Sequence, residues 1–204
     1  MSTESIRPLT RSDVPSAREV LGRAFADNPA YMALFGFMET SARHRAVAAM
    51  NGGFADAAVR FQHAEGIERD GALAAIALWA APGEYPISLA GKALHALPAI
   101  PTGVRGIVNL LRMDAALTQR HIRETHYYLW VLGVDPSAQG RGYGSKMLER
   151  LNALGDIAHL PWYLETDKES SVRLYSRHGY EVLEEFTMPK VNDARMWAMH
   201  RKPR

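Results

Sequence analysis

The chain has 204 residues, of which 47% are hydrophobic and 23% are charged, and its formal net charge is +2. This balance is typical of a folded domain, and so small a charge does not indicate nucleic-acid binding, which normally uses a clustered basic face. The absence of cysteine excludes disulfides, thiolate metal sites and cysteine nucleophiles. No apolar run approaches the roughly 18 residues of a membrane helix, and the first residues lack the apolar core of a secretory signal. We therefore expect one cytoplasmic domain, residues 1–204, that binds neither nucleic acid nor membrane.

The first eighty residues indicate alternating strands and helices. Pro15 suits the first turn of a helix, and Asp70-Gly71 is a typical hairpin turn. The expected elements, in chain order, are a strand at Ser5–Leu9, a helix beginning at Ser12 or Asp13, a helix over about 40–61 that is interrupted at Gly52-Gly53, and two strands around the hairpin turn, the second of which, Ala72–Ala80, is apolar enough for a central strand.

Residues 84–125 break the rhythm of the strands. Pro86, Pro98 and Pro101 punctuate two expected helices, Ser88–Ala96 and Val104–Glu124. We treat this segment as a helical elaboration of the same domain. The elements expected after it are a strand at 126–134, a helix over about 142–154, a strand at 161–167, a helix that ends at Gly179, and strands at 181–188 and 194–201.

Three glycines, Gly140, Gly142 and Gly144, lie between the strand at 126–134 and the helix that follows it. The first turn of a helix presents free N–H groups and the positive end of the helix dipole to an anion, and glycine lets the backbone approach phosphate oxygens closely. The stretch matches neither the GxxxxGK[ST] P-loop nor the GxGxxG dinucleotide fingerprint, which disfavours a nucleotide-binding or NAD-binding enzyme. A glycine turn without a ligand is the structural alternative.

Together with Gln139, these glycines read Q-x-x-G-x-G, which closely resembles the acyl-CoA-binding motif of the GNAT N-acetyltransferase superfamily. Tyr175, Gly179 and Tyr180 resemble the Y-x-x-x-G-F/Y ending of the last helix in that family. The resemblance covers essentially the whole chain and is carried by 129–151 and 161–180, while 77–84 and 195–203 resemble a bacterial branch with small-molecule acetyltransferases. It implies a mixed α/β GNAT fold: a central, mostly antiparallel twisted sheet of about seven strands flanked by helices, with a helical insertion between strands 3 and 4.

The resemblance also implies an acetyl-CoA-dependent N-acetyltransferase, EC 2.3.1.-, whose co-substrate is acetyl-CoA. The backbone of 132–134 would lie along the pantetheine arm, and the N–H groups of 139–145 would hold the pyrophosphate. Gly133 fits a bulge, a close backbone approach or a packing gap, Arg141 adds charge or points to solvent, and Ser171 contacts the cofactor arm or caps a helix. The predicted cofactor-binding residues are Leu132, Gly133, Val134, Gln139, Gly140, Arg141, Gly142, Tyr143, Gly144, Ser145, Ser171 and Tyr175.

Tyr175 matches the residue that, in the family, donates a proton to the leaving thiolate. A phenol with a pKa of about 10 can protonate an alkyl thiolate with a pKa of about 8.5 at little cost, and a core aromatic is the alternative role. The general base is open among Glu165, His126 and Glu124, with a water chain as a further possibility. Some members carry a carboxylate near the start of the cofactor strand, where this chain has two tyrosines.

The acceptor is expected to be a small-molecule primary amine. Alternatives are a protein or peptide amine, or an acyl-CoA sensor without turnover, and a homodimer is left open. The histidines show no HxH or HExxH spacing, and His121 and His126 are too far apart for one helical face, so we expect no metal. The side chains expected to line an apolar acceptor cleft or to lie in the core are Tyr31, Met32, Phe35, Phe37, Ile107, Leu110 and Met113.

Overall fold

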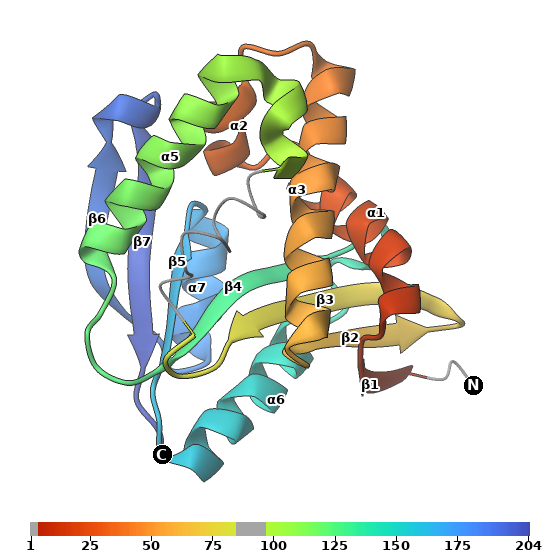
Figure 1. The fold of residues 1–204 in the computed structure, drawn as a ribbon. Coiled ribbons are helices and arrows are strands. Elements are labelled where there is room, and N and C mark those ends of the chain that lie inside the picture. Colours follow the sequence, from red (N-terminus) through yellow and green to blue (C-terminus); the bar gives the residue numbers. More distant parts are fainter. Residues whose placement is uncertain (1–3, 85–96) are drawn as a thin grey trace.

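The computed structural model describes residues 4–84 and 97–204, and its centre is one seven-stranded mixed sheet (Figure 1). The strands lie in the order β1-β2-β3-β4-β5-β7-β6. Neighbouring strands are antiparallel except for β4 and β5, which are parallel. This confirms the mostly antiparallel sheet predicted above. The bounds are β1 (Glu4–Pro8), β2 (Ala64–Arg69), β3 (Ala72–Ala80), β4 (Tyr127–Val134), β5 (Trp162–Thr166), β6 (Glu181–Met188) and β7 (Ala194–Arg201).

Helices cover both faces of the sheet. On one side α1 and α3 pack against β3 and β4, and α2 and α5 extend this layer over β7. On the opposite side α6 and α7 bury the other face of β4 and β5. Figure 1 shows α5 lying across the β6–β7 end of the sheet, while α6 lies beneath β4. The helices within the described residues are α1 (Val14–Phe25), α2 (Pro29–Phe35), α3 (Thr40–Arg60), α5 (Gly103–Arg120), α6 (Tyr143–Ala158) and α7 (Glu169–Arg177).

The helix α3 is continuous, so the predicted interruption at Gly52-Gly53 is wrong. A Cβ added to Gly52 would lie 3.0 Å from the Cγ of Arg18 on α1. On α1, a Cβ added to Gly22 would lie 2.6 Å from the Cβ of Ala48 on α3. Glycines on both helices therefore allow close packing between them, and tertiary contact outweighs the low helix propensity of glycine.

Other differences concern element ends. The helix α2 follows Asn28, in a segment for which no element was predicted. The helix α5 stops at Arg120 instead of Glu124, and α6 continues to Ala158. The expected helix Ser88–Ala96 lies outside the described residues. In the described part of the chain, no helix combines the length and apolar character needed to cross a membrane.

The parallel pair β4–β5 is short, and this opens the sheet. Only Tyr127 with Trp162 and Tyr128 with Tyr163 are paired. Beyond these residues the two strands separate, so in Figure 1 β2, β3 and β4 run across the view while β5, β6 and β7 run roughly vertically. Backbone groups on the facing edges of β4 and β5 are thus free of strand pairing beyond the split.

Candidate active site

A cleft of about 690 Å³ occupies the split between β4 and β5. One wall is formed by β4, the glycine loop and α7, and the other by side chains from α1, α2, α3, α5 and the end of β5. Of the predicted site residues, those that line the cleft are Leu132, Gly133, Val134, Gln139, Gly140, Gly144, Glu165, Ser171 and Tyr175.

The open edge of β4 presents hydrogen-bonding groups to the cleft. The N–H of Asp135 donates to the carbonyl of Ala74 in β3, 2.9 Å away. Because successive backbone groups alternate between the two edges of a strand, the N–H groups of Val134 and Leu132 point the opposite way, towards β5. The strand can therefore pair with an extended ligand in place of the missing neighbour.

An ion pair anchors the end of β4 to α1. The Asp135 carboxylate accepts hydrogen bonds from Arg23 at 2.6 and 2.9 Å and from the N–H and hydroxyl of Ser137 at 2.9 and 2.6 Å. Burial alone would raise the pKa of Asp135, but the bonds from Ser137 and Arg23 outweigh burial and leave this pKa below its ordinary value. This contact holds the entry into the glycine loop.

Gly140 and Gly142 have the conformation and the space expected of a ligand loop. Their φ angles are +76° and +81°, in the left-handed region, and a Cβ on either would meet nothing within 4 Å. Gly142 is the N-cap of α6. Among the described residues, the N–H groups from Gly140 to Ser145 donate to no backbone carbonyl. These amides, at a helix start, fit an anionic group such as a pyrophosphate.

Gly144 has a different role from its neighbours. A Cβ at this position would lie 3.3 Å from the Cδ2 of Leu174 and 3.9 Å from Val134. Gly144 therefore lets the first turn of α6 lie close to α7. The three glycines thus divide into two that shape the loop and one that allows helix packing.

The remaining loop residues act through different atoms. The side-chain amide of Gln139 donates to the carbonyl of Val134 at 3.2 Å, so it ties the loop to β4. Arg141 is exposed. The Tyr143 hydroxyl donates to Glu4 at 2.7 Å, so its side chain points towards β1, and only its backbone N–H belongs to the loop's free amides.

Gly133 is a packing residue. A Cβ at this position would lie 2.5 Å from Leu21 and 3.1 Å from Phe25, both on α1. The irregularity in β4 is elsewhere: Leu78 pairs with Val131 and Trp79 with Leu129, which leaves Trp130 as the bulged residue. Of the three possibilities for Gly133, the structure supports close approach of α1, and the bulge at this residue is wrong.

Tyr175 lies near the end of α7 and reaches the cleft from the α6–α7 side. It is 7% exposed, and burial, with a smaller contribution from Asp167, raises its pKa above the ordinary value. The helix ends after it because Gly179, at a φ of +87°, allows the N–H of Tyr180 to donate to the Tyr175 carbonyl at 3.1 Å. The Y-x-x-x-G-Y spacing thus reflects a helix end that fixes the position of the tyrosine.

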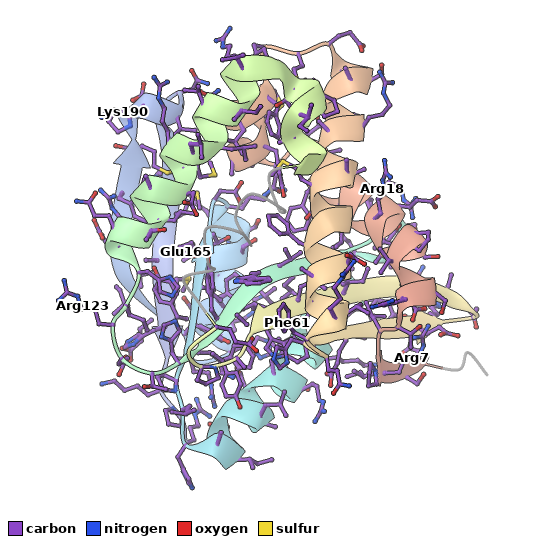
Figure 2. The ribbon with its side chains drawn as sticks, viewed as in Figure 1. Arg7, Arg18, Phe61, Arg123, Glu165 and Lys190 are labelled. Atoms are coloured by element: carbon purple, nitrogen blue, oxygen red, sulfur yellow. The ribbon has the colours of Figure 1, made fainter. Side chains whose placement is uncertain are left out.

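Glu165 lines the cleft from β5, two residues beyond the split between β4 and β5. Its side chain is 4% exposed, and its Oε2 accepts a hydrogen bond of 2.6 Å from the Tyr128 hydroxyl. Figure 2 shows Glu165 in the interior of the molecule, whereas Arg123, on the loop between α5 and β4, points outwards. Tyr128 was not predicted as a site residue, because nothing in the sequence distinguishes it from a core aromatic.

Two histidines lie beside Glu165, and their spacing in the sequence did not predict that they would be in contact. His121 Nδ1 lies 3.8 Å from Glu165 Oε1, and His121 Nε2 lies 2.9 Å from His126 Nε2. They meet because α5 ends at Arg120 and His121 adopts extended backbone (φ −61°, ψ 135°). The two histidines do not share a helical face, and the sequence spacing predicted no other way for them to meet. Glu124 is exposed and contributes its carbonyl, which accepts from His126 Nδ1 at 2.6 Å.

Asp167, another residue missed in the sequence, joins β5 to the start of α2. Its carboxylate accepts from the side chain of Asn28 at 2.8 Å and from the N–H of Ala30 at 2.7 Å. Burial raises the pKa of Asp167 even though the hydrogen bond from Ala30 opposes this. A carboxylate two residues before a helix is a common pattern, which is why the sequence alone did not single it out.

The second wall is mainly apolar. Of the side chains expected there, Tyr31, Leu110 and Met113 line the cleft, whereas Phe35 is fully buried in the core and Met32 is 39% exposed. Further apolar lining residues are Phe25, Leu34, Phe54, Leu117 and Trp130.

Within residues 4–84 and 97–204 there is no cluster of three or more His, Asp or Glu side chains placed to hold a metal ion, and the expectation of a metal-free site stays a prediction.

Comparison with known proteins agrees with this geometry. Residues 105–182 match the model of the acetyltransferase (GNAT) domain. The mycothiol acetyltransferase of Mycolicibacterium gilvum is 35% identical to the chain over 63 residues, which are 27% of this chain and 21% of that relative. The match therefore spans about a fifth of the relative's length.

The fold has solved counterparts. A protein of Corynebacterium glutamicum described as histone acetyltransferase HPA2 and related acetyltransferase superposes with a TM-score of 0.68 at 21% identity, over 100% of this chain and 98% of that one. Arylalkylamine N-acetyltransferase 2 of Aedes aegypti superposes with a TM-score of 0.64 at 14% identity, over 99% and 100%. Residues 105–182 thus match the acetyltransferase (GNAT) domain model, and the described residues adopt the fold of these solved acetyltransferases.

Proposed function

We propose that the protein transfers the acetyl group of acetyl-CoA to the primary amine of a small, largely apolar molecule, by direct attack of the amine. One observation carries this proposal: a single cleft joins an unpaired strand edge, a helix-start glycine loop and a buried tyrosine to an apolar wall that contains a carboxylate. Acetyl-CoA has an extended polar arm, a pyrophosphate and a thioester, and each would meet a suitable group.

The donor wall would bind through the backbone. The N–H groups of Leu132 and Val134 would pair with the amides of the pantetheine arm, and the free amides of 140–145 would hold the pyrophosphate. Ser171 lines the cleft on α7, where its hydroxyl lies within the wall that the arm would follow. Arg141, being exposed, would add positive charge outside the loop.

Tyr175 would supply the proton that the reaction requires. Bound acetyl-CoA supplies the thioester; the amine forms a C–N bond to its carbonyl carbon, and the C–S bond breaks. The departing thiolate needs a proton, and a buried phenol with a raised pKa is fully protonated at neutral pH. The raised pKa makes the phenol a weaker acid, and burial would raise the pKa of the thiol in the same cleft as well. Tyr175 reaches the cleft from the face opposite Glu165, so the donor and the acceptor would meet between them.

The acceptor wall favours an amine on an apolar body. Its rings and methionines would bury hydrocarbon, while Glu165 and Asp167 would face the ammonium group. By their names, one similar protein acetylates arylalkylamines and another is a mycothiol acetyltransferase. Within the described part of the chain, three carboxylates, Asp114, Glu165 and Asp167, line the cleft, so polycations belong in the test panel beside the apolar amines.

A thiol-release assay with acetyl-CoA and a panel of amines tests the proposal. The panel contains 2-phenylethylamine, tyramine, agmatine, spermidine and a peptide with a free amino terminus, and we expect the first two to react fastest. Thermal stabilisation by CoA with no turnover of any amine would support the sensor alternative. Stabilisation by NAD but not by CoA would reject the acetyl-CoA assignment altogether, and preference for the peptide would redirect the acceptor class.

A further inference from the structure

We propose that Glu165, His121 and His126 form a proton relay that carries the proton of the acceptor amine from the cleft to the surface. The inference rests on the proposed function, which requires such an exit. An ammonium ion and acetyl-CoA yield an amide, CoA as a thiol and one proton. Because the thiol keeps one hydrogen, the remaining proton must leave a cleft whose acceptor wall is mostly apolar.

The relay begins at a carboxylate in the cleft. Glu165 lines the cleft, and its Oε2 is held by the Tyr128 hydroxyl at 2.6 Å. Its other oxygen, Oε1, makes no hydrogen bond within the described residues and faces His121 Nδ1 at 3.8 Å. A shift of about 1 Å would bring these atoms within hydrogen-bond distance. One oxygen thus positions the carboxylate and the other is available for a proton.

The hydrogen positions in the histidine pair follow from the acceptors around them. A carbonyl can only accept, so the 2.6 Å contact with the Glu124 carbonyl places a hydrogen on His126 Nδ1. In a neutral ring, His126 Nε2 is then the acceptor, and the 2.9 Å contact takes its hydrogen from His121 Nε2. Burial lowers the pKa of His126, which favours this neutral form. His121 Nδ1 is therefore the position that receives a proton, and it faces Glu165.

Aromatic rings around His121 hold the two histidines in position. The rings of Tyr128 and Tyr163 lie edge-on to His121 with centroids 4.7 Å away. His121 is 7% exposed in its side chain, while His126 is partly exposed. A proton that passes from Glu165 to His121 Nδ1 would release the Nε2 hydrogen of His121 to His126 Nε2. The doubly protonated His126 would then lose its Nδ1 hydrogen to water as the bond to the Glu124 carbonyl opens. The path thus runs from a buried to an exposed group.

The hydrogen positions can be tested without turnover. In protein with ¹⁵N-labelled histidine, a long-range ¹H–¹⁵N spectrum at neutral pH should show hydrogen on His126 Nδ1 and on His121 Nε2. Glu165→Gln should shift the His121 ring nitrogens and leave those of His159, an exposed residue at the end of α6, unchanged. The opposite tautomers, or an unaltered His121 signal in Glu165→Gln, would overturn the relay.

Kinetic measurements with the fastest amine of the panel test whether the relay is used during turnover. His121→Gln keeps a donor towards His126 but cannot pass a proton, so we expect kcat to fall by about tenfold or more, with the KM for acetyl-CoA within about twofold. His126→Ala should lose a similar factor and recover on addition of imidazole, since that position is partly exposed. His159→Asn is the matched control and should retain wild-type kcat. Turnover with unaffected variants would overturn the relay alone, whereas no turnover of any amine by the wild type would overturn the proposed function.

Discussion

The two walls of the cleft are built in different ways. The proposed donor wall combines backbone groups of the β4–α6 connection with side chains of α7. The acceptor wall uses side chains from α1, α2, α3, α5 and the end of β5, which are far apart in the sequence. Backbone recognition needs only a conformation, which a few glycines at defined spacing reveal. Side-chain recognition needs residues that are distant in the sequence to lie close together in space. The choice of acceptor therefore depends on tertiary contacts.

Gly142→Val should break the donor wall most strongly. A branched side chain at a φ of +81° forces the loop out of shape and obstructs its amides. We expect acetyl-CoA affinity to fall roughly 100-fold, about 2.7 kcal/mol, as one or two charge-assisted hydrogen bonds are lost. Calorimetry with acetyl-CoA measures this. Gly71→Val, at a φ of +79° in the β2–β3 turn, has the same backbone strain and should retain full affinity.

Tyr175→Phe should separate chemistry from donor binding. We expect kcat to fall about tenfold or more while acetyl-CoA affinity changes little, because only the proton donor is lost. Tyr180→Phe is the matched control: its hydroxyl donates to Asn152 at 3.2 Å, inside the core. That variant should lose stability and keep kcat. An unchanged kcat in Tyr175→Phe would remove this residue from the mechanism.

Met113→Trp should affect the acceptor wall alone. The larger ring would fill part of the cleft beside Leu110, so we expect the acceptor KM to rise by about tenfold, equal to about 1.4 kcal/mol. Acetyl-CoA affinity should stay within about twofold of wild type. Leu111→Trp, on the neighbouring position of α5 and 61% exposed, should change neither quantity. A loss of acetyl-CoA affinity in Met113→Trp would show that the walls are not separate.

Asp135→Asn should loosen the junction between the walls. The bonds from Arg23 and Ser137 stabilise the charged carboxylate, so we expect a loss of about 1–2 kcal/mol in the free energy of unfolding at neutral pH. Because the folded-state pKa is lowered, this stabilisation is complete above the unfolded pKa of about 3.9 and is lost as the pH falls through the folded value. Denaturation at pH 7 and at pH 3 should therefore show the two proteins converge in acid. A constant difference would contradict the assignment.

Gly144→Ala should have the smallest effect. The new methyl would meet the flexible end of Leu174 at 3.3 Å, which can move, so we expect a loss of less than about 1 kcal/mol. Gly133→Ala offers the contrast, since its methyl would lie 2.5 Å from Leu21 and should cost about 1–3 kcal/mol. Thermal denaturation ranks the two. Equal losses would mean that α6 and α7 pack as rigidly as α1 and β4.

Local sequence predicted most of the fold because its signals act over a few residues. The alternation of strands, the Asp70-Gly71 turn and the helix end at Gly179 all appear as expected. The failures share a cause. Gly52 breaks no helix because α1 packs against it, and the bulge lies at Trp130 because the register with β3 shifts at this point. Neither contact can be predicted from neighbours in the chain.

The sequence by itself determined the proposed donor side of this protein: a strand, a glycine loop, a helix start and a tyrosine at a helix end, each defined by spacing along one segment. Only the tertiary structure decided what faces them. His121, His126 and Glu165 come together because α5 ends one residue before His121 and because β5 lies beside β4 only at its start. The end of α5 and the divergence of β4 from β5 set the distances between these three side chains. Proton transfer and binding across a cleft depend on such distances in space, which spacing along the sequence does not give.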